Sequence, residues 1–156
     1  MALAARVLEL AAPDLRPPTS VREDGDPPRI VRAAGPEALA KAAAVTVVDE
    51  RDAVGLGNVA VICPSSLVEP LAVALEQAGI EFGIAPRSGL DLQVTVVPVG
   101  LVKGLEVDAS VVVEPAGIVA EEAQGYRALY VALTRSTKRL AIVHADPLPE
   151  VLLNEG

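Results

Sequence analysis

The chain has very few aromatic residues, one cysteine, one histidine and no tryptophan. Its 156 residues are 51% hydrophobic but only 2% aromatic, so alanine, valine, leucine and isoleucine must build the core. The single cysteine, Cys63, excludes a disulfide framework within the chain. Because His144 is the only histidine, no set of metal ligands occurs at useful spacing, and we expect no metal site.

Three further absences narrow the function. No apolar run reaches the roughly 18–20 residues that a membrane span needs, and the first residues lack a signal-peptide pattern, so we expect a cytoplasmic protein without membrane contact. The net charge is −8, and acidic residues outnumber basic ones in both halves, which weighs against strong nucleic-acid binding by this chain alone. No G-x-x-x-x-G-K-[ST] phosphate loop occurs in the sequence.

Segments with strand and helix periodicity alternate along the chain, as in a parallel α/β sheet covered by helices. Strands are expected over residues 29–34, 58–63, 94–97, 110–114 and 140–144, with a strand or loop over 80–91. Helices are expected over residues 2–12, 36–52, 66–78 and 121–135, and Ser66 with Glu69 has capping-box spacing. We divide the chain into an N-terminal helix with a proline-rich connection (1–35), an α/β domain (36–146) and a tail (147–156).

The segment Lys103–Asp108 (KGLEVD) follows a valine-rich strand. Ligands of open α/β sheets bind beyond the carboxyl ends of strands. Gly104 would let backbone N–H groups approach an anion, and Glu106 could accept hydrogen bonds from a ribose hydroxyl. A plain β-turn with solvated charges explains the same residues, and the residues alone favour that simpler interpretation.

Arg135 stands where a helix-like run ends and a strand begins. A guanidinium in that place can stabilise charge on a phosphoryl group held by a neighbouring domain, which is worth ~10³–10⁵ in rate. The simpler interpretation is an arginine that complements the carboxyl end of a helix dipole, together with Lys138 and Arg139. Again the residues alone favour the simpler interpretation.

Other patterns are assigned structural roles. Gly55–Ala60 (GLGNVA) matches the dinucleotide fingerprint by letter, but it precedes a strand instead of following one. Cys63 has no histidine partner in sequence, and His144 ends an apolar strand, so both are expected to be structural. Glu121 and Glu122 are interpreted as acidic charge at a helix N-terminus.

Two phrases together resemble motifs of superfamily 1 helicases of the UvrD/Rep type. Leu101–Asp108 (LVKGLEVD) resembles motif V, and Leu129–Ser136 (LYVALTRS) resembles motif VI. Asn58–Gly83 is similar to the strand–helix unit that precedes motif V there. DNA-unwinding members carry a polar residue where this chain has Val102, and a phenylalanine where it has Val107. The wording VPVGLVKGLE is more similar to the HelD-type branch, which associates with bacterial RNA polymerase.

The resemblance implies a RecA-like C-terminal motor domain (2A), with a mostly parallel α/β sheet and helices on both faces. In that family ATP and Mg²⁺ lie between two RecA-like domains, and the first domain supplies the phosphate loop. The resemblance makes Arg135 the catalytic arginine finger and places Gly104 and Glu106 at the nucleotide. Further contacts to nucleic acid or to the loop fall on Lys103, Tyr130 and Thr134.

The expected function follows from this resemblance. The chain would be the C-terminal motor fragment of an ATP-dependent DNA helicase or translocase, cut just past motif IV. Its partners would be the N-terminal RecA-like domain of the same parent and, through the parent, DNA or RNA polymerase. One alternative is part of a HelD-like ATPase that remodels or recycles RNA polymerase without unwinding duplex DNA. Another is a stand-alone α/β interaction domain. We expect the fragment itself to bind no cofactor tightly and to hydrolyse no ATP, because it lacks the phosphate loop.

Overall fold

A computed structural model describes residues 29–55, 57–85, 93–102 and 105–145. The strands are β1 (Arg29–Arg32), β2 (Val59–Cys63), β3 (Phe82–Ile84), β4 (Val94–Pro98), β5 (Val107–Val113) and β6 (Ser136–His144). The helices are α2 (Pro36–Val54), α3 (Val68–Gln77), α4 (Pro115–Glu121) and α5 (Gly125–Leu133), with short 3₁₀ turns η1 (Ser65–Leu67) and η2 (Val99–Leu101). The helix expected over residues 2–12 and the tail lie outside the described residues.

The strands form one sheet in the order β1-β6-β5-β2-β4-β3. Every described pair of neighbouring strands is parallel. This confirms the predicted parallel α/β architecture. The central strands read as unbroken apolar runs because both faces of the sheet are covered, so side chains on either side of each strand lose contact with water.

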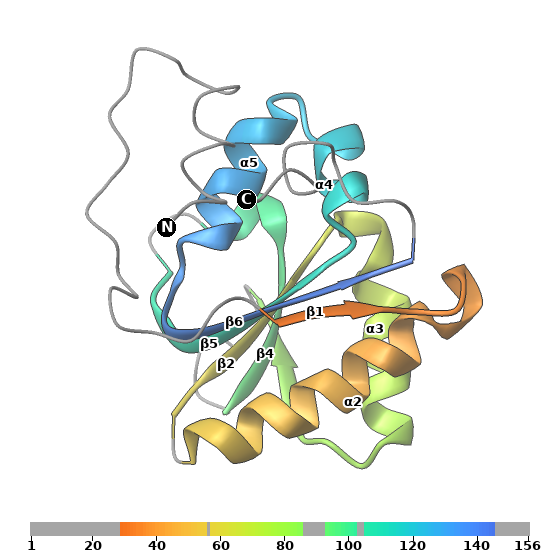
Figure 1. Cartoon of the computed structure of the whole chain (residues 1–156), viewed down its shortest axis with the longest axis vertical. Helices are drawn as coiled ribbons and strands as arrows, with labels where there is room; N and C mark the ends of the chain where they lie inside the picture. The colour runs from red at the N-terminus through yellow and green to blue at the C-terminus, as the bar shows by residue number, and fades with distance from the viewer. Residues whose placement is uncertain (1–28, 56, 86–92, 103–104, 146–156) are drawn as a thin grey trace.

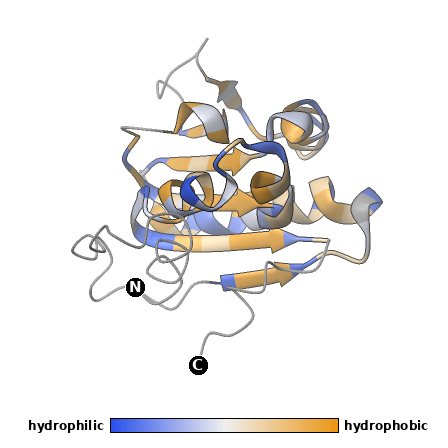
Figure 2. Cartoon of the chain, turned by 90° about the horizontal axis from the view of Figure 1, so that it is seen from above, coloured by the Kyte–Doolittle hydropathy of each residue, from blue (hydrophilic) through white to orange (hydrophobic). Residues whose placement is uncertain are grey.

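Helices cover both faces of the sheet (Figure 1). On one face α2 and α3 pack against alternate strand residues such as Val61, Val111 and Val143. On the other face α4 and α5 pack against the intervening residues, among them Ile62 and Ile142. Figure 2, seen from above, shows that the strands are largely hydrophobic, whereas the helices carry both hydrophobic and hydrophilic residues. The core therefore consists of two aliphatic layers, one on each side of the sheet.

The helix expected over residues 121–135 is shorter: it is α5, Gly125–Leu133, and a separate helix, α4, precedes it. The sequence reading missed α4, which begins at Pro115 directly after β5. Glu114 enters it through a left-handed conformation with φ of 53°. The two helices meet at Gly125, where an added Cβ would lie 2.2 Å from the Val119 carbonyl oxygen. Only glycine allows this close approach. The helices are separate because the backbone is extended at Glu122, directly after α4, with φ of −88° and ψ of 142°.

Three smaller expectations are also corrected. β5 begins at Val107 and β6 at Ser136, a few residues earlier than their apolar runs predicted, because charged residues near both strand starts find partners in the fold. The predicted capping box is wrong: α3 has Leu67 at its N-cap and no side-chain cap. The Ser66 hydroxyl donates instead to the carboxylate of Glu121.

Candidate functional site

The junction between α5 and β6 is held by hydrogen bonds to the last turn of the helix. Leu129 is fully buried and fixes α5 against the sheet. The buried Thr134 lies just beyond the helix, and its hydroxyl contacts the backbone carbonyl oxygens of Tyr130 and Val131, each at 3.1 Å. Carbonyls at the end of a helix lack intrahelical partners, so this hydroxyl both satisfies them and fixes the backbone that leads to Arg135.

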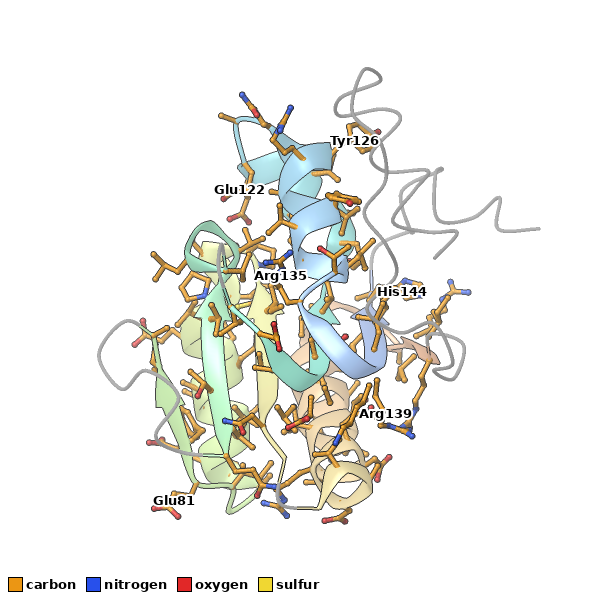
Figure 3. The ribbon with its side chains drawn as sticks, turned by 90° about the vertical axis from the view of Figure 1, so that its left-hand side faces the viewer. Glu81, Glu122, Tyr126, Arg135, Arg139 and His144 are labelled. Atoms are coloured by element: carbon orange, nitrogen blue, oxygen red, sulfur yellow. The ribbon has the colours of Figure 1, made fainter. Side chains whose placement is uncertain are left out.

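Arg135 turns its guanidinium back along α5 (Figure 3). Its Nε donates to the Val131 carbonyl oxygen at 2.9 Å, and its Nη2 donates to the Thr134 hydroxyl at 3.0 Å. The side chain is half-buried, yet no carboxylate in the described part of the chain forms an ion pair with it. Cations withdrawn from water are normally paired, so this arrangement suits an anion that comes from outside the described residues.

Neighbouring cations at the same end of the sheet are neutralised within the fold. Arg139 pairs with Glu50 at 2.9 Å, and Lys138 pairs with Asp108 at 3.4 Å. The interpretation of Lys138 and Arg139 as helix-dipole complements is therefore wrong, since both side chains meet carboxylates. Arg135 does contact a carbonyl at the end of α5, and among these three cations it alone has no acidic partner in the described ranges.

The segment between β4 and β5 crosses the sheet from one end to the other. Val102 is only 2% exposed and lies in the core with α5. Its carbonyl oxygen accepts a hydrogen bond from the Leu105 N–H at 2.9 Å. Because β4 and β5 both run parallel to β2, this crossing takes the chain from the carboxyl end of β4 to the amino end of β5. Lys103 and Gly104 lie outside the described residues.

Glu106 and Arg135 are brought together by this crossing. Glu106 is exposed and immediately precedes β5. The next residue, Val107, pairs with Ser136 and donates its N–H to the Arg135 carbonyl oxygen at 3.2 Å. The KGLEVD segment was expected beyond the carboxyl end of the preceding strand, but Glu106 lies at the amino end of β5, beside the amino end of β6. Arg135 directly precedes β6, as its place before a strand in the sequence predicted. The pairing itself depends on strand register, which the sequence does not display.

Tyr130 lies on the same turn of α5. Burial raises the pKa of its phenol above the ordinary value, while the positive charge of Arg135 acts in the opposite direction. The phenol is half-buried and stays protonated, so it can donate a hydrogen bond. Tyr130, Thr134 and Arg135 thus form one short cluster at the end of the helix.

The GLGNVA segment has a structural role. An added Cβ at Gly57 would lie 2.5 Å from an Asp108 carboxylate oxygen, and the Asn58 N–H donates to that same oxygen at 2.9 Å. The turn therefore contacts a residue near the start of β5, and this contact explains its glycine without a bound dinucleotide. Sequence reasoning missed that Asp108 accepts this hydrogen bond. The sequence offered one signal for it, an acidic residue at the end of the KGLEVD segment.

The remaining candidates lie at the opposite, carboxyl end of the sheet. Cys63 is buried at the end of β2, and burial, with a smaller contribution from Glu121, raises the pKa of its thiol to about 12. His144 ends β6 and accepts a hydrogen bond from the Ala33 N–H at 2.8 Å through its carbonyl oxygen. Glu121 lies at the carboxyl end of α4, so its interpretation as N-terminal helix charge was wrong.

No protein-family model matches the chain, and no curated protein matches it. Among solved structures it is similar to the C-terminal domain of a possible DNA helicase from Lactobacillus plantarum WCFS1. The TM-score is 0.68 at 24% sequence identity, over 97% of this chain and 91% of that one. It is also similar to the SWI2/SNF2 ATPase core of Sulfolobus solfataricus in complex with double-stranded DNA. There the TM-score is 0.56 at 16% identity, over 81% of this chain and 29% of that one. The likeness lies in the fold: the chain is a RecA-like α/β domain.

Proposed function

We propose that the chain is the C-terminal RecA-like motor domain of an ATP-dependent superfamily 1 helicase or translocase. In this proposal it completes an ATP site whose phosphate loop belongs to an N-terminal RecA-like domain of the same parent protein. The similarity in fold to a domain from a possible DNA helicase supports the proposal. The observation that carries it is Arg135, a half-buried guanidinium without a carboxylate partner among the described residues, next to Glu106 at one end of the sheet.

The proposed mechanism uses the fixed orientation of Arg135. ATP, held with Mg²⁺ by the partner domain, supplies the phosphoryl group that is transferred to water. Arg135 donates N–H hydrogen bonds to the terminal phosphate and stabilises the negative charge that develops during transfer. Because Val131 and Thr134 already hold the guanidinium, little reorganisation is needed when the domains close. This preorganisation is the main contribution of the chain to the reaction.

The adjoining segment would bind the rest of the nucleotide. Glu106 is exposed beside the backbone of Arg135, where its carboxylate can accept a hydrogen bond from a ribose hydroxyl. Gly104 would let the backbone approach the nucleotide closely, and Lys103 would contact nucleic acid or steady the loop. Thr134 positions Arg135, and Tyr130 offers a phenolic donor on the same turn.

The test is Arg135→Ala in the full-length parent. Steady-state phosphate release should fall by about 10³-fold, since an arginine finger is worth ~10³–10⁵ in turnover. Affinity for a fluorescent ATP analogue should change by only a few-fold, because the guanidinium acts mainly on charge that develops in the transition state.

Arg51→Ala is the matched control for this test. Arg51 lies in the last turn of α2, on the opposite face of the sheet, and its nearest acidic group is the exposed Asp52. This variant should keep parental turnover. Unchanged phosphate release in Arg135→Ala would remove the arginine-finger assignment.

A second candidate is a parent ATPase that remodels RNA polymerase without unwinding duplex DNA. Val102 favours it, because this residue is packed in the core at the position where the DNA-unwinding relatives carry a polar residue. The net charge of −8 also favours a protein partner over a phosphate backbone.

Two assays on the full-length parent separate the candidates. ATP-dependent release of RNA polymerase from DNA, with no displacement of a labelled strand from a duplex, supports the second candidate. ATP-dependent strand displacement without polymerase binding supports the first.

A further inference from the structure

A cavity of about 420 Å³ opens between η2 and α5. Its apolar wall consists of Val99, Val102, Ala128 and Val131. Its polar lining consists of Glu122, Gln124, Arg127 and Tyr130. An apolar interior with a few polar groups near the opening is the usual form of a binding site for a side chain or small molecule.

Glu122 stands over one side of this cavity. Its carboxylate lies above Gly100, where an added Cβ would meet only the Glu122 Oε1 atom, at 3.9 Å; Figure 3 shows Glu122 directed toward η2. The residue is half-buried, and no cation in the described ranges forms an ion pair with it. Arg127, which also lines the cavity, is exposed and forms no ion pair with another described residue. The carboxylate is therefore available to an incoming cation.

The three kinds of group around the cavity match the chemistry of an arginine side chain. A guanidinium pairs with a carboxylate through charge-assisted hydrogen bonds and stacks on the face of an aromatic ring such as that of Tyr130. Its aliphatic stem suits the valine-lined wall. The cavity lining also includes a cation, Arg127, but Arg127 is exposed whereas Glu122 is half-buried. Water and salt screen an exposed charge more strongly, so the negative charge of Glu122 dominates and disfavours a phosphate in the same place.

We propose that this cavity receives an arginine side chain from the ATP-binding domain of the parent protein. The identity of the partner rests on the proposed function, whereas the chemistry of the occupant rests on the cavity itself. The cavity wall includes Tyr130 and Val131, whose carbonyl oxygens contact the Thr134 hydroxyl. Val131 also accepts the hydrogen bond from Arg135. A side chain seated in the cavity therefore packs against the same helix turn that aligns the proposed finger.

The first experiment titrates the ¹⁵N-labelled chain with two small probes and follows backbone amide shifts by NMR. N-acetyl-arginine amide carries the guanidinium, and N-acetyl-citrulline amide is its neutral isostere. We expect the arginine probe to shift the amides that line the cavity and to bind about five- to tenfold more tightly than the citrulline probe, since the charge-assisted bond is partly solvent-screened.

Two variants test the carboxylate. Glu122→Gln should remove the difference between the two probes. The matched control is Glu76→Gln, because Glu76 is exposed on α3, which packs on the opposite face of the sheet; this variant should bind both probes as the parent chain does. Retention of the unperturbed amide spectrum checks that both variants are folded.

Equal binding of the two probes, shifts centred outside the cavity, or a Glu122→Gln chain that still prefers arginine would overturn the proposal. So would an oligothymidylate probe that shifts the cavity amides more strongly than the arginine probe, because the cavity would then be a nucleic-acid groove.

The partner assignment is tested in the full-length parent. There Glu122→Gln should lower kcat/KM for ATP by about five- to tenfold, and Glu76→Gln should not. Normal turnover by Arg135→Ala would defeat the proposed function while leaving the titration result intact. Loss of turnover by Arg135→Ala, together with a failed titration, would defeat the cavity proposal alone.

Discussion

At the scale of single residues, Arg135 and Arg139 lie near the same end of the sheet but have different hydrogen-bond partners. Arg139 reaches Glu50, whose side chain is 1% exposed, and its Nε and Nη2 donate to the two carboxylate oxygens at 2.9 and 3.3 Å. Arg135 has the same chemistry but contacts only a carbonyl and a hydroxyl. The first arginine stabilises the fold, and the second has no carboxylate partner among the described residues.

Arg139→Met should destabilise the chain strongly. It leaves the buried Glu50 carboxylate with only Arg29, whose Nη1 lies 3.7 Å from it, and stranding a buried charge costs about 2–3 kcal/mol. Urea unfolding followed by circular dichroism measures the change. Arg51→Met is the control: its pair with Asp52 is long, at 3.9 Å, and exposed, so the loss should stay below about 1 kcal/mol. Equal losses would contradict this account.

Cys63 should be unreactive in the native state and should make stability fall in alkali. Its pKa is raised from the ordinary 9.0 to about 12, chiefly by burial, so the folded state holds the proton more tightly than the unfolded state. The resulting stabilisation is present below pH 9 and is lost as pH rises from 9 toward 12.

Urea unfolding at pH 8 and pH 10 tests this pH dependence. The parent chain should lose about 1 kcal/mol more between the two values than Cys63→Ala does. Ellman's reagent at pH 8 should modify the thiol only after urea is added. Rapid modification of the native chain would show that the thiol is accessible.

At the scale of the element, α4 and α5 depend on a contact that only glycine permits. The Gly125 backbone approaches Val119 so closely that any side chain would overlap the α4 backbone. α5 packs against the sheet through Leu129 and Leu133, which are both fully buried. The position of Arg135 at the end of α5 follows from this packing.

Gly125→Ala should therefore cost about 3 kcal/mol, because the backbone of α4 has to move to relieve the overlap. The matched control is Gly35→Ala. Gly35 is the N-cap residue of α2, and an added Cβ there meets nothing within 4 Å. The free energy of unfolding should therefore change by no more than about 0.5 kcal/mol. Thermal unfolding of both variants gives the comparison, and a Gly125→Ala chain as stable as the control would contradict the packing argument.

The candidate site could be predicted only in part. Glu106 and Arg135 became candidates only through the resemblance of their segments to helicase motifs, because the residues alone favoured simpler interpretations. That both residues lie at the same end of the sheet could not be predicted. Their proximity depends on the path of the chain from β4 to β5 and on the pairing of Val107 with Ser136. The cavity beside Glu122 was missed entirely, because its lining comes from two separate segments of the sequence, residues 99–102 and 122–131.

At the scale of the whole molecule, the domain is half of a catalytic arrangement in the proposed function. Its six-stranded sheet carries a cation and an exposed carboxylate at one end, while the sequence contains no phosphate loop. In the described part of the chain, no helix is both long and apolar enough to cross a membrane.

The isolated chain should hydrolyse no ATP. Without a loop to cradle the β- and γ-phosphates, nucleotide affinity and alignment of the attacking water are both lost, and Arg135 alone cannot replace them. A coupled phosphate-release assay on the purified chain should give the buffer rate. Turnover above that rate, abolished by Arg135→Ala, would show that the chain contains a complete site of its own.

The sequence by itself determined the fold class and the chemistry available. Valine-rich strand segments bury the side chains of both their faces only when helices cover the sheet on both sides. Composition and spacing alone therefore predict this layered fold. Which charged residues are neutralised and which remain available was decided by the tertiary structure. Strand register and helix crossing bring Glu50 to Arg139 and leave Arg135 without a described carboxylate, because such pairs join residues that only the folded chain brings within a few ångströms.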